Sequence, residues 1–129
     1  MKKIVSTLGI VCFVFTALFI VVKNTSENYF YQEKSATEIE EMIEKQGEVV
    51  VYVYSDSCSK CIYLKRSLEE KMFAEKIYGL NTGKEENMTF IKKYGIHSTP
   101  EFFVFEGEAV RKRLTGIKDA KEVIDFINK

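Results

Sequence analysis

Proline, histidine and cysteine are scarce in this chain of 129 residues, which has one proline, one histidine and three cysteines. Three cysteines are too few for the disulfide framework of a small secreted domain. A single histidine leaves few ligands for a zinc centre, which needs about four. Acidic and basic residues are equal in number, 19 of each, so the chain lacks the basic excess expected of a nucleic-acid-binding protein.

Charge is also absent from Ile4 to Val22. At about 1.5 Å rise per residue, a helix over this stretch nearly matches the roughly 30 Å hydrocarbon core of a bilayer. Lys2 and Lys3 precede it, and the positive-inside rule therefore keeps the N-terminus in the cytoplasm. We expect residues 1–23 to be a single-pass anchor in the cytoplasmic membrane, with the rest of the chain on the extracytoplasmic side.

Three other interpretations of this stretch remain open. A buried helix of a soluble domain would normally carry a polar face, which is missing here. A cleaved signal peptide would have a shorter apolar region and a small-residue cleavage site of the A-x-A type, and neither is evident. A lipoprotein cysteine at Cys12 would not be expected after the bulky Val11. We favour the uncleaved anchor, with Cys12 as a small apolar residue of the span.

Residues 24–34 are mostly polar and predict a tether, with the aromatic run Tyr29–Tyr31 either at the membrane interface or at the start of the domain. The domain itself is expected over residues 35–129. A capping box, either Ser35 with Glu38 or Thr37 with Glu40, predicts the start of its first helix. That helix is expected to end at a glycine and to bury one apolar stripe: Ile39, Met42 and Ile43, followed by Gly47.

The most informative stretch is a strand–turn–helix pattern that contains two cysteines. Residues 49–54 are β-branched or aromatic and predict a buried strand, and residues 62–68 predict a helix. Cys58 then lies at the start of the helix, where unpaired N–H groups and the helix dipole stabilise a thiolate. Cys61 lies three residues on, on the same side and within disulfide reach. This pattern predicts a redox-active dithiol.

The remainder of the chain predicts a strand, a helix, a β-hairpin and a closing helix. These elements are expected at residues 74–81, 85–94, 102–105, 109–115 and 118–128. The two helices are assigned apolar stripes of Met88, Ile91 and Tyr94 and of Val123, Ile124 and Ile127. A βαβ crossover followed by a hairpin gives an α/β fold with a mixed sheet and helices on both faces.

From Ser35 to Lys129 the sequence resembles the thioredoxin superfamily. The CxxC follows the first apolar strand, and Thr99-Pro100 follows it at about forty residues, the position of the family's cis-proline. Gly107 in the hairpin and Gly116 before the last helix also correspond. The resemblance implies a thioredoxin-like three-layer fold. It further implies that the Thr99 backbone beside Pro100 pairs with the extended chain of a substrate.

Several residues depart from the pattern of cytosolic thioredoxins. Ser59 and Lys60 stand between the cysteines in place of Gly-Pro, and Ser57 stands in place of Trp. Tyr52 occupies the position of the family's buried acid, which leaves the proton relay of the second cysteine without its usual group. Asp56 lies in the turn and is interpreted as a solvated or capping residue. The combination with an anchor looks like extracytoplasmic thioredoxin-like proteins of Gram-positive bacteria, in particular the bacteriocin-accessory group.

The expected chemistry is thiol–disulfide exchange, in which Cys58 is the nucleophile and Cys61 resolves the mixed disulfide. Lys60 and His97 are candidates for tuning the Cys58 pKa; a solvated Lys60 and an exposed, inactive His97 are the alternatives. The aromatic residues of the strand over residues 102–105 are expected in the core. The basic segment 111–113 is interpreted as a solvated strand edge that discourages aggregation.

We therefore expect an oxidoreductase that acts as oxidase or isomerase of exported peptides or proteins. Its only redox group would be the Cys58–Cys61 disulfide, with no metal and no other cofactor. Its partners would be peptide or protein thiols and disulfides and a recycling partner that the sequence does not identify, with no nucleic acid. Two alternatives are a metal-binding CxxC module and a catalytically silent thioredoxin-fold adaptor for exported peptides.

Overall fold

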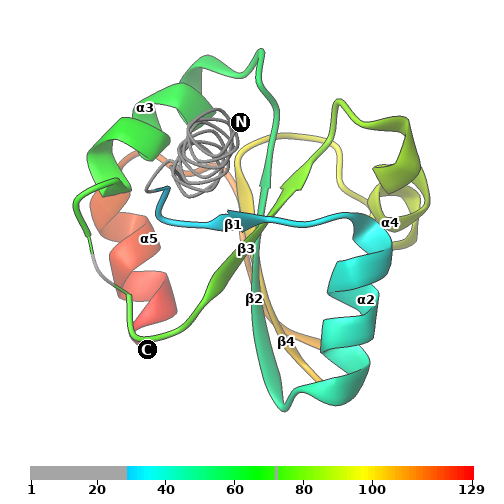
Figure 1. Cartoon of the computed structure of the whole chain (residues 1–129). Helices are drawn as coiled ribbons and strands as arrows, with labels where there is room; N and C mark the ends of the chain where they lie inside the picture. The colour runs from blue at the N-terminus through cyan, green and yellow to red at the C-terminus, as the bar shows by residue number, and fades with distance from the viewer. Residues whose placement is uncertain (1–28, 72) are drawn as a thin grey trace, which may run out of the picture.

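The computed structural model describes residues 29–71 and 73–129 (Figure 1). The predicted anchor at residues 1–23 and the first part of the predicted tether lie outside this range. Within the described part of the chain, no helix has both the length and the apolar character needed to span a bilayer. The location of the domain therefore remains a prediction from the sequence.

The described residues form a five-stranded mixed sheet with helices on both faces. The mixed sheet and its two helix layers agree with the prediction, whereas the short strand Gln32–Glu33 is a fifth strand that was not expected. The strand order is β1-β3-β2-β4-β5, with β2 parallel to β3 and antiparallel to β4. β4 and β5 form the expected hairpin. The elements, in chain order, are β1 Gln32–Glu33, α2 Ala36–Lys45, β2 Glu48–Tyr54, α3 Ser59–Leu68, β3 Ile77–Asn81, the 3-10 turn η1 Glu85–Asn87, α4 Met88–Lys93, β4 Glu101–Glu106, β5 Ala109–Leu114 and α5 Ala120–Ile127.

The central strand β2 is buried on both faces, and its alternating side chains divide the core into two layers. Figure 1 shows α3 and α5 on one side of the sheet and α2 and α4 on the other. Val50, Tyr52 and Tyr54 face α3 and α5, together with Phe102 of β4. On the α2 side the sheet contributes the alternate residues: Val49, Val51, Val53, Phe103 and Phe105. The expected burial of the β4 aromatics is confirmed.

Residues 29–34, assigned to the tether from the sequence, belong instead to the domain. β1 pairs in parallel with β3 at one edge of the sheet, and Phe30 and Tyr31 are buried in the layer beneath α3 and α5. The Tyr31 ring lies directly against the backbone of Gly79, where any Cβ atom would clash with it. A glycine at this position of β3 is thus needed for the close approach of an aromatic ring.

The first helix begins as predicted by one of the two candidate capping boxes, Ser35 with Glu38. The Glu38 backbone N–H donates to Ser35 Oγ at 3.3 Å, and the Ser35 N–H donates to a Glu38 carboxylate oxygen at 2.9 Å. This N–H bond is the largest of the contributions that lower the pKa of Glu38 to about 2. The helix ends close to the predicted glycine: α2 ends at Lys45, Gln46 is the extended C-cap and Gly47 follows it, although Gly47 lacks the positive φ of a left-handed cap.

Three further boundaries or faces differ from the prediction. The strand expected from residue 74 begins at Ile77, and the closing helix begins at Ala120 after an Asp119 cap. The helix expected over residues 85–94 opens with the 3-10 turn η1, and α4 begins at Met88. Of the predicted apolar stripe, Ile91 and Tyr94 pack against the core as expected, whereas Met88 is 40% exposed and Phe90, outside the stripe, is fully buried.

The buried aromatic residues of the N-terminal segment generate a prediction about stability. Phe30→Ala removes a ring that packs on Tyr52 at 5.0 Å between centroids, and it should lower the free energy of unfolding by about 3 kcal/mol. Gln32→Ala, two residues away on an exposed position of β1, is the control and should leave it unchanged within about 0.5 kcal/mol. Urea denaturation measures both, and equal stability of the two variants would contradict the role of this segment.

Candidate active site

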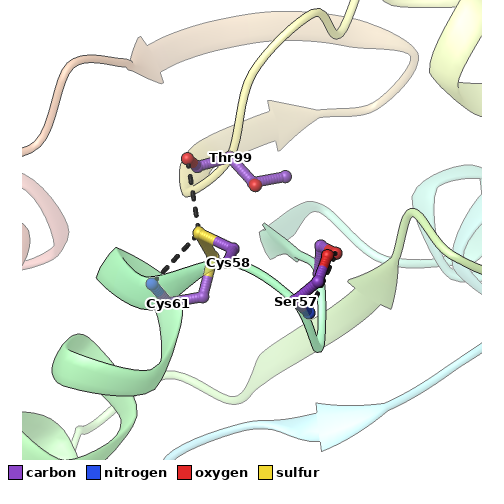
Figure 2. The surroundings of a disulfide bond; sticks show 5 residues. Ser57, Cys58, Cys61 and Thr99 are labelled. Atoms are coloured by element: carbon purple, nitrogen blue, oxygen red, sulfur yellow. Dashed lines mark hydrogen bonds between the residues drawn. A yellow bond between two sulfur atoms is a disulfide. The ribbon is translucent and has the colours of Figure 1, made fainter.

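The two cysteines meet at the N-terminus of α3, next to the loop that precedes β4 (Figure 2). Cys58 is the N-cap residue, in an extended conformation, and the Cys61 backbone N–H donates to its Sγ atom at 3.2 Å. The two residues form a disulfide with their Cα atoms 5.2 Å apart. Sequence reasoning therefore located both the helix start and the pair correctly.

The two sulfur atoms differ in accessibility. Cys58 is only half-buried, whereas Cys61 is 4% exposed and belongs to the core layer between the sheet and α3. An incoming thiolate therefore meets Cys58 first, because attack requires access to the sulfur. In the reduced protein, the Cys61 N–H and the unpaired N–H groups of the first turn would stabilise a Cys58 thiolate and lower its pKa.

Thr99 lies directly beside the reactive sulfur. Its carbonyl oxygen is 3.5 Å from Cys58 Sγ (Figure 2). The Thr99–Pro100 peptide bond is cis. A disulfide sulfur has no hydrogen to donate, so this contact becomes a hydrogen bond only when Cys58 is a thiol. The carbonyl dipole then favours the thiol, while the Cys61 N–H favours the thiolate. Cys58 therefore sits between two opposed backbone dipoles.

A buried ion pair fixes the loop that carries Thr99. Glu101 is 2% exposed, and its carboxylate accepts hydrogen bonds from the Arg113 guanidinium at 2.8 and 3.1 Å and from Ser98 Oγ at 2.9 Å. Arg113 also donates to the carbonyl oxygens of Tyr94 and Gly95, at 3.2 and 2.9 Å. One side chain of β5 thus holds both ends of the segment between α4 and β4.

Residues 111–113 lie on the edge strand β5 with Arg111 and Arg113 exposed, as predicted, but the interpretation is incomplete because both arginines are also paired with carboxylates. Arg113 is bound to a buried carboxylate, and Arg111 donates to Glu48 at 2.6 Å with Glu106 also within 3.7 Å. The available signal was Glu101 itself, an acidic residue that opens the apolar β4 run and has to be paired if it is buried. An arginine on the partner strand of a hairpin is a natural candidate for that pair.

Tyrosines occupy the region where the family has a buried acid. Tyr52 is 1% exposed, and Tyr31 and Tyr54 pack on it with ring centroids 5.1 and 5.3 Å away. Burial raises the pKa of all three hydroxyls, so they remain neutral phenols. The Tyr54 hydroxyl donates to a Glu33 carboxylate oxygen at 2.5 Å. Hydrogen bonds from Lys84 and Tyr54 lower the pKa of Glu33.

The cap of α3 is Cys58, and Asp56 is exposed, in agreement with its interpretation as a solvated residue. Its carboxylate accepts a hydrogen bond from the Asn81 side-chain amide at 2.8 Å, which ties the turn before the cysteines to the end of β3. Asn87 continues the network, because its fully buried amide donates to the Asn81 carbonyl and accepts from the Ala36 N–H, both at 2.8 Å.

Ser57, which stands in place of the tryptophan of cytosolic thioredoxins, turns toward Ser55, and the two hydroxyl oxygens are 3.0 Å apart.

Lys60 and His97, the two candidates for tuning the thiolate, are both exposed. Lys60 lies in the first turn of α3 between the cysteines. His97 lies in the loop before Thr99 and lines a cavity of about 290 Å³ together with Ser55, Met88 and Thr99. None of the hydrogen bonds or ion pairs between described residues joins either side chain to a cysteine. Their roles in tuning stay predictions.

The described part of the chain contains no group of three or more His, Cys, Asp or Glu side chains placed to hold a metal ion. The site can instead support sulfur chemistry, because Cys58 lies beside the Thr99 carbonyl and forms a disulfide with Cys61. Cys58 is accessible, Cys61 is in bonding range, and no further group is needed to move electrons between a dithiol and a disulfide.

Comparison with known proteins assigns the family. Residues 35–129 match the family model described as a thioredoxin-like domain, and the chain belongs to this family. Among solved structures, thioredoxin f from spinach chloroplast is 20% identical, with a TM-score of 0.63 over 76% of this chain and 90% of that one. A mutant thioredoxin from Halobacterium salinarum is 19% identical, with a TM-score of 0.62 over 76% and 87% of the two chains. These likenesses show the fold alone.

The fold and the cysteine pair together support thiol–disulfide oxidoreductase activity as a class. The family match covers the predicted domain and leaves residues 1–34 outside it. The thioredoxin-like fold predicted from the sequence is therefore confirmed. The subgroup and the membrane anchor stay predictions.

The Glu101–Arg113 pair generates a prediction about stability. Arg113→Ala leaves a buried carboxylate without its cation, and it should lower the free energy of unfolding by about 3 kcal/mol. Arg111→Ala is a matched control, since Arg111 lies two residues away on the same strand but pairs with exposed carboxylates. This control should lower the free energy of unfolding by less than about 1 kcal/mol. Chemical denaturation at neutral pH measures both. Equal losses would contradict the distinction between the buried and exposed pairs.

The environment of Cys58 generates a prediction about reactivity. In a Cys12→Ser, Cys61→Ser double variant Cys58 is the only thiol, and the residue 61 N–H is retained. The rate of alkylation by iodoacetamide should reach half its maximum at a lower pH than for free cysteine, because the helix N-terminus favours the thiolate. The same variant unfolded in denaturant is the control and should titrate as an ordinary cysteine. Identical profiles for the folded and unfolded forms would contradict the prediction.

Proposed function

We propose that this protein is a membrane-anchored thiol–disulfide oxidoreductase that forms or rearranges disulfides in exported peptides or proteins. The observation that best supports this proposal is the position of the accessible Cys58 sulfur, which caps α3 and lies 3.5 Å from the Thr99 carbonyl oxygen. The nucleophile and the backbone that would hold a substrate are therefore adjacent. Membrane attachment and the extracytoplasmic side are supported by the uncharged stretch from Ile4 to Val22 and the lysines before it.

In the oxidising direction a substrate thiolate attacks Cys58 Sγ, and the Cys58–Cys61 bond breaks. The electron pair passes to Cys61, which leaves as a thiolate and takes up a proton. A second substrate thiolate then attacks the substrate sulfur of the mixed disulfide and releases Cys58 as a thiolate. The substrate gains a disulfide, and the protein becomes a dithiol. Stabilisation of the leaving Cys58 thiolate by the Cys61 N–H supports this direction.

The Thr99 backbone would orient the substrate. An extended peptide that pairs with this segment would bring its own sulfur toward Cys58, since the Thr99 carbonyl is already beside that atom. The Glu101–Arg113 pair keeps the segment in position. Substrates are therefore peptides or flexible protein segments that can adopt an extended conformation near a cysteine.

The choice of oxidation or isomerisation rests on the compartment. Disulfides form and persist outside the cytoplasmic membrane, where the proposed anchor would hold the domain. The dithiol formed in each turnover has to be reoxidised by a separate recycling partner. A role like that of the bacteriocin-accessory group, acting on exported peptides, fits the small anchored domain and the departures at Ser57, Ser59 and Lys60 from the cytosolic pattern.

The test combines a redox titration with trapping of the intermediate. The full chain, carrying Cys12→Ser and kept in mild detergent, is equilibrated with glutathione buffers, and the oxidised fraction is measured by thiol alkylation. A potential nearer to that of strong oxidants than to that of thioredoxins, which are reductants, supports the proposal. A strongly reducing value contradicts the direction, and a pair that never exchanges contradicts the proposed function.

Trapping identifies the attacking sulfur. With a peptide that contains one disulfide, Cys61→Ser should accumulate a mixed disulfide, because the resolving thiol is missing, whereas Cys58→Ser should accumulate none. Mass spectrometry of the non-reduced products measures both. Equal trapping by the two variants would contradict the assignment of Cys58 as the nucleophile, and full activity of Cys58→Ala in cells would favour the silent adaptor.

A further inference from the structure

Two adjacent apolar side chains of α3 are exposed. Ile62 is 43% and Tyr63 is 54% exposed, whereas the other large apolar side chains exposed on the described surface, Met88 and Val110, belong to α4 and β5. Residues three or four apart share one face of a helix, so both lie in one exposed stripe with Arg66. Single exposed apolar residues are ordinary, but adjacent ones bordered by charge favour a contact surface.

The same helix is basic. It contains Lys60, Lys65 and Arg66 and no acidic residue, although the whole chain has equal numbers of acidic and basic residues. Residues 69–70, both glutamates, follow only after the helix ends. Within the described range, no ion pair involves any of the three cations. Cations in the last turn complement the helix dipole, but Lys60 in the first turn opposes it. Helix stability therefore does not account for the whole cluster.

The start of the described chain lies against this helix. The Lys65 ammonium is 3.4 Å from the centre of the Tyr29 ring, and Tyr29 stacks on the buried Tyr31. The predicted anchor ends at residue 23, so residues 24–28 alone separate it from this contact. Even a fully extended chain spans no more than about 20 Å over that interval. An inserted anchor therefore holds α3 close to the bilayer surface.

We propose that the exposed face of α3 is a lipid-contacting surface that docks the domain on an anionic bilayer. Ile62 and Tyr63 would lie at the level of the headgroups, a depth at which tyrosine is enriched in membrane proteins. Lys60 and Arg66 would lie beside the lipid phosphates, where each cation strengthens binding about fivefold. The inference rests on the proposed function, because membrane attachment supplies the short tether.

Docking through this face would place the redox site at the membrane surface. Cys58 caps the same helix four residues before Ile62, about 6 Å along the helix axis. Figure 2 shows Cys58 between the first turn of α3 and Thr99, so a lipid contact one turn along the helix leaves the Thr99 side open to a substrate. The substrates would then be peptides that meet the enzyme at the bilayer surface as they leave the membrane.

The contact is mapped on the full chain with a photoactivatable phospholipid that carries a diazirine just below its headgroup. The wild-type protein is reconstituted in vesicles of phosphatidylcholine with phosphatidylglycerol and illuminated, and the labelled peptides are identified by mass spectrometry. Labelling of α3 should exceed that of β5 several-fold, since β5 is the edge strand opposite β1. The wild-type map needs no substitution, so it tests the inference even if a variant fails to fold.

Matched variants identify the side chains responsible. The double variant Ile62→Ser, Tyr63→Ser should lose most of the label at the remaining residues of α3. Val110→Ser is the control, because it removes an apolar side chain that is 42% exposed from β5, and it should lose none. Arg66→Gln should lower the ratio of labelled to unlabelled α3 about fivefold with phosphatidylglycerol and leave it unchanged in phosphatidylcholine alone. All these positions are exposed, so the variants should fold as wild type does.

Two further measurements separate the possible failures. A chain that alkaline carbonate extracts from the vesicles contradicts the proposed anchor and this inference with it. A retained chain whose α3 is labelled no more than β5 overturns the inference alone and favours a protein partner for this face. The double variant should keep the wild-type potential against glutathione, and a changed potential would assign Ile62 and Tyr63 to the redox site and contradict a lipid role. Failure of the wild type to exchange with glutathione counts only against the proposed chemistry.

Discussion

The burial of β2 on both faces is the constraint on which the rest of this structure depends. Its alternating side chains require a helix layer on each side, and its hydrogen-bonding edges are taken by β3 and β4. The chain leaves this strand at Tyr54, at the edge of the layer formed by α3 and α5. A short turn then has to deliver the start of α3 there. The position of Cys58 at a helix N-terminus is thus a consequence of how the central strand is covered.

The site is assembled from segments far apart in the sequence, each held by a different kind of interaction. Cys58 and Cys61 are positioned by the start of a helix, and Thr99 by a loop that the buried Glu101–Arg113 pair fixes to β5. The aromatic residues around Tyr52 belong to the same buried cluster as Cys61, the less exposed of the two cysteines. Accessibility distinguishes the two cysteines, and opposed backbone dipoles act on the outer one. The chemistry of sulfur exchange needs no further group.

Sequence patterns predicted those features that depend on local periodicity or on rare residues. The buried strand, the helix after Cys58, the hairpin and the lone Pro100 could all be identified in this way, and the family resemblance joined them into one fold. Pairings between distant residues escaped, because no local pattern encodes them. Examples are Arg113 with Glu101 and Tyr31 with Gly79. The face of α4 was predicted in part, since Ile91 and Tyr94 contact the core but Phe90 is buried in place of Met88.

The two contacts that Arg113 makes beyond its ion pair have a consequence for local opening. An edge strand such as β5 normally frays on its own, at a lower free energy than the core. Here the same guanidinium holds the carbonyls at the end of α4 and the carboxylate at the start of β4. The edge cannot open at this residue without releasing the segment before Thr99. We therefore expect amide exchange at the outer strand to be coupled to that of the loop beside the disulfide, as in one cooperative unit.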